Sequence, residues 1–166
     1  MENTVEGATE ITRPSHLVVT MFGIPAVSRG GEALEFSTQH AFKALFCLLS
    51  TPEGSLEAET LGERLWPDAP LSRLGQRLST MTWQLRRALG EDAWRVVRHP
   101  GRFEFLADGV EIDLQSARQS VLGASPVDPD AVGMLNRAVL VPWADEPWVR
   151  DIGAENERIL RQLERG

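Results

Sequence analysis

The segment from residue 71 to residue 89 places side chains suited to a phosphate or base-edge ligand on one face of a helix. An apolar stripe follows the three- and four-residue spacing of an amphipathic helix: Leu71, Leu74, Leu78, Met81, Leu85, Ala88 and Leu89. The polar face carries cationic, hydrogen-bonding and aromatic side chains and no acid: Arg73, Gln76, Arg77, Thr80, Trp83, Gln84 and Arg87. Arginine makes paired planar hydrogen bonds to phosphate or guanine, and glutamine makes a similar pair to adenine. We therefore expect this face to contact a ligand of that chemistry, although a solvated helix face is the alternative.

Charge is distributed unevenly along the 166 residues, whose net charge of −7 by itself argues against a nucleic-acid partner. Residues 71–102 contain seven arginines and two acidic residues, which gives this block a net charge of +5. Residues 1–70, with four basic and ten acidic side chains, and residues 103–166, with six and twelve, each have a net charge of −6. Because the Debye length is roughly 8 Å at physiological salt, distant acids are largely screened from a ligand on the basic block.

Local signals predict the elements that must position this helix. Residues 16–23 are rich in β-forming residues, and the Gly30-Gly31 pair predicts a hairpin turn, so a small antiparallel sheet is expected first. A helix at 37–50 follows, whose free N–H groups the hydroxyl of Ser37 or Thr38 can cap. Then come a short strand at 55–56, a helix at 57–66 with Trp66 facing inward, which ends before Pro67, and the helix at 71–89, which ends at Gly90.

A strand–turn–strand pattern at 94–99 and 102–107 comes next, with Arg98 and Arg102 on either side of the Pro100-Gly101 turn. The fold class is therefore expected to be α+β: a winged helix-turn-helix with an N-terminal antiparallel sheet, three helices and a C-terminal β-hairpin wing, followed by a short all-α segment. In such a fold one helix fits the DNA major groove, and the two wing arginines hold the phosphate backbone.

The expected organisation has three parts. Residues 1–15 are acidic and polar and are expected to be a disordered N-terminal tail. Residues 16–113 are expected to form the winged-helix domain, and residues 114–166 a helical segment.

Several motifs together resemble the DNA-binding domain of the SARP (antibiotic regulatory protein) transcription factors. They are LWPDAP at 65–70, LSTMTWQLRRALG at 78–90 and VVRHPGRFEFLADGVEIDL at 96–114. VPWADEPWVRDIGAENERILRQL at 141–163 resembles the early part of the helical bacterial transcriptional activator domain that follows in that family. The resemblance covers residues 16–163 and implies an OmpR/PhoB-type winged helix that binds tandem DNA repeats as pairs.

The sequence departs from the family pattern at three positions on or near the predicted interface. His40 and Ser79 stand where relatives often carry basic residues, and Trp83 stands where they often have a small polar one. The helical segment is also shorter, at about 50 residues, than the activator domain of the family. Trp83 suits either a contact with sugar or a thymine methyl group, or an anchor in a protein interface.

Catalytic, metal and membrane motifs receive no support. The three histidines are scattered, no glycine-rich phosphate loop or metal-ligand spacing occurs, and Asp145-Glu146 is expected to be solvated loop charge. The single cysteine, Cys47, lies in an apolar helical pattern and is expected to be buried. Without a membrane-length apolar run, a signal sequence or a disulfide, we expect a cytoplasmic protein that is not an enzyme and has no cofactor.

The leading hypothesis is a sequence-specific, DNA-binding transcriptional regulator, an activator in the family that it resembles. Its partner would be double-stranded DNA, with RNA polymerase and a second copy of the chain on DNA as further expected partners. The alternative is a winged-helix protein-interaction module that no longer binds DNA, which the net charge of −7, Trp83 and His40 favour.

Overall fold

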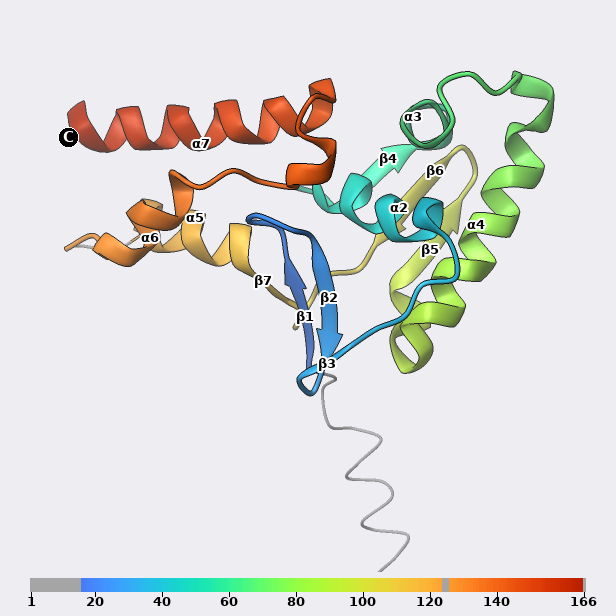
Figure 1. Cartoon of the computed structure of the whole chain (residues 1–166), viewed down its shortest axis with the longest axis horizontal. Helices are drawn as coiled ribbons and strands as arrows, with labels where there is room; N and C mark the ends of the chain where they lie inside the picture. Colours follow the sequence, from blue (N-terminus) through green and yellow to red (C-terminus); the bar gives the residue numbers. More distant parts are fainter. Residues whose placement is uncertain (1–15, 124–125, 166) are drawn as a thin grey trace, which may run out of the picture.

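The computed structural model describes residues 16–123 and 126–165, so the tail expected at residues 1–15 lies outside the described residues. The chain folds as an α+β structure with two small sheets and a set of helices (Figure 1). Helix α4 lies at one end of the molecule, and helices α5, α6 and α7 lie at the opposite end. The fold class expected from the sequence is therefore confirmed, as the winged helix described below.

The first sheet contains the predicted N-terminal hairpin and one additional strand. Its order is β3-β2-β1-β7, formed by β1 (Leu17–Thr20), β2 (Ala26–Arg29), β3 (Glu32–Ala33) and β7 (Glu111–Ile112). Gly30 and Gly31 have φ values of +59° and +86°, which glycine adopts without steric cost, and they form the predicted turn. Strand β7 joins the sheet parallel to β1, a pairing that the sequence analysis did not anticipate.

Three helices occupy the predicted positions: α2 (Gln39–Leu49), α3 (Ala58–Leu65) and α4 (Leu74–Leu89). The Thr38 side chain caps α2 by accepting a hydrogen bond from the backbone N–H of Ala41 at 3.1 Å. A 3-10 turn, η1 (Leu71–Arg73), precedes α4, and Gly90, with φ +56°, ends it. The expectation that Leu71 belongs to the apolar stripe is wrong, because this turn leaves its side chain 76% exposed.

The second sheet forms the wing and has three strands, in the order β4-β6-β5. The predicted hairpin consists of β5 (Val96–His99) and β6 (Arg102–Phe105), and β4 (Ser55–Glu57) pairs antiparallel with β6. A 3-10 segment, η2 (Gly90–Arg95), connects α4 to β5. The carbonyl of Gly101 in the wing turn accepts a hydrogen bond from the N–H of Ala58 at 2.9 Å, so the turn is fastened to the start of α3.

One hydrophobic core holds these layers together. Phe46 from α2 and Phe103 and Phe105 from β6 are at most 1% exposed, and Leu85 of α4 is fully buried. Cys47 is fully buried as well, as expected, and this burial raises the pKa of its thiol to about 12. The apolar face of α4 is therefore fixed against α2 and the wing, and its polar face is left to solvent.

The helical segment packs onto the winged helix from the side opposite to α4 (Figure 1). It consists of α5 (Asp113–Gly123), α6 (Pro129–Leu135), the 3-10 turn η3 (Val141–Trp143) and α7 (Pro147–Arg165). The Asp113 carboxylate accepts hydrogen bonds from the N–H groups of Met21 at 2.7 Å and Phe22 at 3.2 Å. Partial burial raises the pKa of Asp113 above its ordinary value, although these hydrogen bonds act in the opposite direction.

The loop before α7 also contacts α2. Glu146 accepts a hydrogen bond from Lys43 Nζ at 2.8 Å and another from Trp148 Nε1 at 2.9 Å. The expectation that Glu146 is merely solvated loop charge is therefore wrong, because the chain returns to α2 here. Trp143 packs against Phe42 and Phe46, with ring centroids 6.0 and 5.8 Å apart. Within the described residues, no helix is both long enough and apolar enough to cross a membrane.

Candidate nucleic-acid interface

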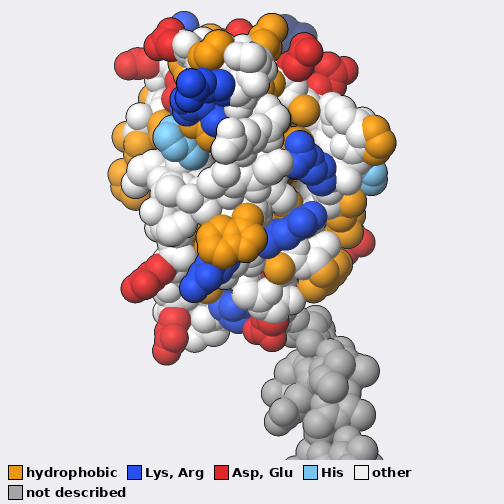
Figure 2. Space-filling view, turned by 90° about the vertical axis from the view of Figure 1, so that its right-hand side faces the viewer, with side chains coloured by type: hydrophobic (Ala, Val, Ile, Leu, Met, Phe, Trp, Pro, Cys, Tyr) orange, Lys and Arg blue, Asp and Glu red, His pale blue; other side chains and the backbone are white. Residues whose placement is uncertain are grey.

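The polar face of α4 and its 3-10 lead-in is open to solvent over most of its length. Of the seven side chains singled out from the sequence, six are exposed: Arg73, Gln76, Arg77, Thr80, Trp83 and Arg87. Figure 2 faces this side of the molecule, where Lys and Arg side chains cross the middle and acidic side chains lie toward the edges. Helix α4 itself contains no acidic residue, so no carboxylate on this helix neutralises its arginines.

A shallow pocket of about 360 Å³ lies where α4 meets the start of α2 and the end of α3. Five predicted residues line it together with four others: Arg73, Gln76, Arg77, Thr80 and Gln84, with Thr38, His40, Trp66 and Met81. The pocket extends the polar face of α4 onto the other two helices. The structure thus brings most of the predicted stripe to one concave surface.

Gln84 differs from the other members of the stripe because it is only half exposed. Its side-chain oxygen accepts a hydrogen bond at 2.9 Å from the Thr38 hydroxyl, the same group that caps α2. This contact fixes the amide and leaves its NH2 group as the donor available to a ligand. Gln84 therefore lies at the junction of α2 and α4, not on the open face where the sequence placed it.

Aromatic rings orient two arginines of the face. The guanidinium of Arg77 lies over the Trp66 ring at 5.8 Å from the centroid, and the His40 ring lies 5.2 Å from the Trp66 ring. The guanidinium of Arg87 lies over the Trp83 ring at 5.2 Å. A guanidinium stacked on a ring keeps its N–H donors at its edge, where they can bond a phosphate or a base.

The wing contributes Arg98 and Arg102 in different ways. Arg98 is exposed, stacks over Phe103 at 5.1 Å and donates a hydrogen bond at 2.8 Å to the hydroxyl of Ser79 on α4. Arg102 lies 3.8 Å from Glu104, which also contacts His99 at 2.9 Å. Arg98 is therefore joined to the α4 surface, whereas the charge of Arg102 is partly balanced within the wing.

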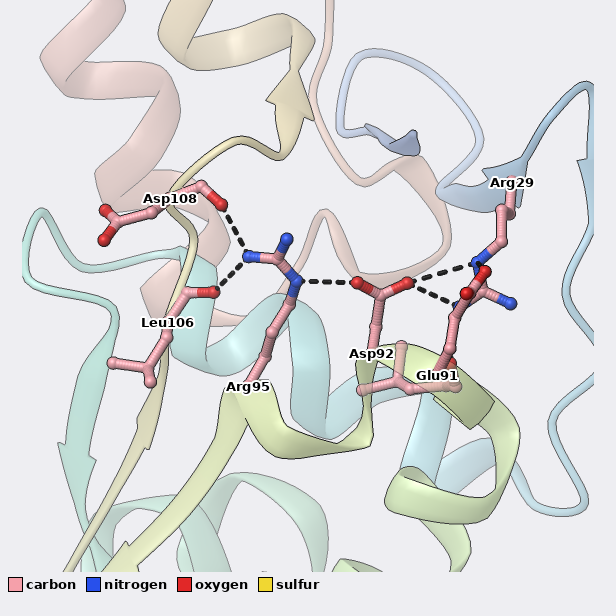
Figure 3. A network of polar contacts seen from close by, with 7 residues as sticks. Arg29, Glu91, Asp92, Arg95, Leu106 and Asp108 are labelled. Atoms are coloured by element: carbon pink, nitrogen blue, oxygen red, sulfur yellow. Dashed lines mark hydrogen bonds and ion pairs between the residues drawn. The ribbon is translucent and has the colours of Figure 1, made fainter. Parts of the chain in front are cut away.

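Two arginines of the basic block bond to other parts of the protein: Arg86, which stays exposed, and Arg95, which is buried. Arg86 donates to the carbonyl of Val96 at 2.8 Å. Arg95 is 3% exposed and donates to Asp92 at 2.8 Å and to the carbonyls of Leu106 and Asp108 (Figure 3). Because Arg95 and Asp92 are buried as a pair, the net charge of +5 of residues 71–102 lies on the other six arginines and Glu91.

The same network fastens the end of α4 to the first sheet. Arg29 on β2 pairs with Asp92 at 2.6 Å and with Glu91 at 3.2 Å (Figure 3). It also donates to the carbonyl of Leu89, a favourable position for a cation because the negative end of the helix dipole lies there. Asp92 is fully buried between Arg29 and Arg95, so it links β2, the end of α4 and the base of the wing.

The sequence analysis did not identify three residues that the structure adds to the interface. Thr38 had been assigned only a capping role, Trp66 had been assigned to the core, and Ser79 had been noted only as a departure from the family. Contacts between separate elements bring Thr38 and Trp66 next to α4. Ser79 lies on α4 itself and bonds to Arg98 of the wing. Residues 16–123 and 126–165 contain no group of three or more His, Cys, Asp or Glu side chains that could hold a metal ion.

Comparisons with known proteins bear on the fold. No protein-family model and no curated protein matches the sequence. Among solved structures, Mycobacterium tuberculosis EmbR, determined in complex with a low-affinity phosphopeptide, aligns with a TM-score of 0.63 and 16% sequence identity. The alignment covers 89% of this chain and 43% of that one, so this chain spans less than half the length of its structural neighbour. The chain therefore has a winged-helix fold that is similar to part of EmbR.

Proposed function

We propose that this protein is a sequence-specific, DNA-binding transcriptional regulator in which α4 enters the major groove. The observation that carries the proposal is the acid-free, exposed face of α4, whose arginines are oriented by neighbouring rings. The major groove is about 12 Å wide and admits a single α-helix. The arginines at positions 73, 77 and 87 would then contact guanine or phosphate, with Gln76, Thr80 and Gln84 as further hydrogen-bonding groups.

The wing supports this assignment by its position. Arg98 lies beside α4, to which it is bonded through Ser79, so a phosphate at the groove edge would meet both elements. Arg102 supplies a second cation near the wing turn, weakened by Glu104. The wing arginines would supply affinity, and the α4 face would supply sequence preference.

The finer parts of the proposal follow the family that the sequence resembles. They are activation of transcription, contact with RNA polymerase, pairing of two copies on repeated DNA sites and action in the cytoplasm. The twelve acidic and six basic side chains of residues 103–166 favour contacts with a cationic protein surface over a second DNA duplex.

A second function, a protein-interaction module, is favoured by the exposed tryptophans. Trp83 is 60% exposed and Trp94 is 58% exposed, and exposed tryptophans often anchor protein interfaces. The two functions differ in salt dependence. Each phosphate neutralised on duplex DNA contributes about −0.9 to the slope of log affinity against log salt, whereas a protein interface need not show such a slope.

The test is selection from a pool of random duplexes with wild-type protein and with an Arg77→Ala, Thr80→Ala double variant. Both side chains are exposed, so the variant is expected to fold. The matched control is Arg161→Ala, Gln162→Ala, which changes two exposed side chains on α7, at the other end of the molecule.

The proposal predicts that wild type and control enrich the same sequence and that the double variant loses this enrichment. Loss of one base-reading contact costs about 1–3 kcal/mol, or roughly 5- to 150-fold in affinity. Absence of enrichment together with absence of salt-sensitive binding at 50 mM salt would refute DNA binding and leave the protein-interaction module.

A further inference from the structure

Trp83 places a large apolar ring on the face that we assign to DNA. We propose that Trp83 recognises the C5 methyl group of a thymine in the major groove and so determines part of the sequence preference. The inference rests on the proposed function, which it extends by naming the base that this residue selects.

The position of Trp83 on α4 is defined by its helical neighbours. Residues seven apart lie nearly in line along an α-helix, so Thr80 and Arg87 form one row, and Gln76 and Trp83 form the next. On the far side of that second row, Ser79 and Arg86 bond to Arg98 and Val96 of the wing. Trp83 therefore lies between the central row of the face and the wing, so a helix seated in the groove would bring its ring to the bases on the wing side.

The orientation of Trp83 is restricted by Arg87. The guanidinium lies over the indole at 5.2 Å from the ring centroid, four residues along the helix. One face of the ring is thus occupied by Arg87, and Trp83 is still 60% exposed. A ring that is already held loses little side-chain entropy when a ligand contacts it.

The chemistry of the ring selects among the groups that the major groove presents. The C5 methyl group of thymine is the apolar group among the major-groove edges of the four bases, and apolar side chains contact it there. The face of an aromatic ring carries negative partial charge and therefore disfavours contact with phosphate. The indole has one donor and no acceptor, so it cannot accept from the amino groups of adenine or cytosine. The methyl group is the best match.

A protein partner matches this surface less well. Arg73, Arg77 and Arg87 share the face with Trp83, and an interface centred on the tryptophan would remove their charges from water. Helix α4 has no acid to compensate them, so a protein partner would have to supply every counter-charge, whereas a DNA duplex supplies phosphates on both sides of the groove.

The test uses the duplex that wild type enriches, in which each thymine is replaced in turn by deoxyuridine, which lacks only the C5 methyl group. Affinities are measured for wild type, Trp83→Ala and Trp83→Phe, at one salt concentration and across a salt series. Trp94→Ala is the matched control, because it removes another exposed tryptophan that lies outside α4, in η2.

We expect wild type and Trp94→Ala to lose about fourfold in affinity at one or two thymines, since burying one methyl-sized group contributes about 0.8 kcal/mol. Trp83→Ala is expected to bind thymine and deoxyuridine equally at those positions and to keep its salt slope. Trp83→Phe is expected to keep part of the discrimination.

Two results would overturn the inference while leaving DNA binding intact. One is the same thymine preference in Trp83→Ala as in wild type, and the other is a wild type that is indifferent to deoxyuridine at every position. If wild type enriches no duplex at all, the proposed function fails, and this inference fails with it.

Discussion

Replacing Asp92 by asparagine removes the one negative charge held between Arg29 and Arg95. The carboxylate is fully buried and bonds to Arg95 at 2.8 Å and to Arg29 at 2.6 Å. Arg95 is itself 3% exposed and keeps its contacts with the carbonyls of Leu106 and Asp108. The Asp92→Asn variant therefore leaves a buried guanidinium without its counter-charge while it preserves the shape of the side chain.

Removing one partner of a buried ion pair costs about 3–5 kcal/mol, since the remaining charge stays desolvated. For a protein of this size each kcal/mol lowers the melting temperature by about 2–4 °C. We therefore expect Asp92→Asn to lower the melting temperature by about 6–20 °C. The neighbouring Glu91 pairs with the same Arg29 at 3.2 Å but is 66% exposed. A surface pair of this kind contributes about 0–1 kcal/mol, so Glu91→Gln is expected to lower the melting temperature by less than about 4 °C.

The measurement is thermal unfolding of wild type, Asp92→Asn and Glu91→Gln under identical buffer conditions, followed by circular dichroism. Urea unfolding at 25 °C provides the free energies directly. Equal destabilisation by the two substitutions would refute the assignment of Asp92 as the buried link between β2, α4 and the wing. A small effect of Asp92→Asn alone would refute it as well.

Three further predictions concern packing, thiol reactivity and pH. Gly75→Ala, at an open position on α4, is expected to stabilise the protein by about 0.5–1 kcal/mol. Gly62→Ala is expected to be less favourable than Gly75→Ala, because a Cβ there would displace the side chain of Leu74. Urea unfolding of both variants checks this, and a greater gain from Gly62→Ala would contradict it. Cys47, buried and with a pKa of about 12, is expected to resist a thiol reagent at pH 8 until the protein unfolds, and rapid labelling of native protein would contradict its burial. Asp113 has a raised pKa in the folded state, so the folded protein binds the Asp113 proton more tightly than the unfolded chain does. The contribution of Asp113 to stability is therefore greatest below the ordinary pKa of 3.8 and declines as the pH rises through the folded-state value. The stability of wild type relative to Asp113→Asn should decrease over that interval in urea unfolding at a series of pH values, and an increase would contradict the sign.

Local patterns predicted the elements well, because their signals lie within a few residues. The Gly30-Gly31 turn and the Thr38 cap depend on the conformational freedom of glycine and on the reach of one hydroxyl. The three- and four-residue periodicity of apolar residues in α4 identified its buried side from Leu78 to Leu89. It failed at Leu71, because the chain there forms a 3-10 turn whose different rotation per residue points the side chain outward.

The features of the fold and of the candidate site that local patterns did not predict depend on contacts between distant segments. The parallel pairing of Val18 with Glu111 joins strands more than ninety residues apart, and the residues of a two-residue strand such as β7 carry no signal of which strand they pair with. In the candidate site, helical periodicity predicted that most of the chosen polar residues are exposed, but it did not predict the hydrogen bond between Gln84 and Thr38. A charge count cannot separate a buried arginine such as Arg95 from an exposed one such as Arg73, because both add the same unit charge. The roles of these residues in DNA binding stay predictions.

The hydrogen bond between Gly101 and Ala58 has a thermodynamic consequence for ligand binding. A hairpin turn that is held to the body of the protein is ordered during folding, so docking onto a ligand does not have to restrict it again. Association should then proceed as a rigid-body encounter, and calorimetry should show a heat-capacity change that matches the apolar surface buried at the contact, without the larger change that accompanies folding on binding. An Ala58→Pro substitution removes the N–H donor at the first position of α3, where proline is tolerated. It would leave the wing strands paired but release the turn, so that binding would have to restrict the turn and the association would become weaker.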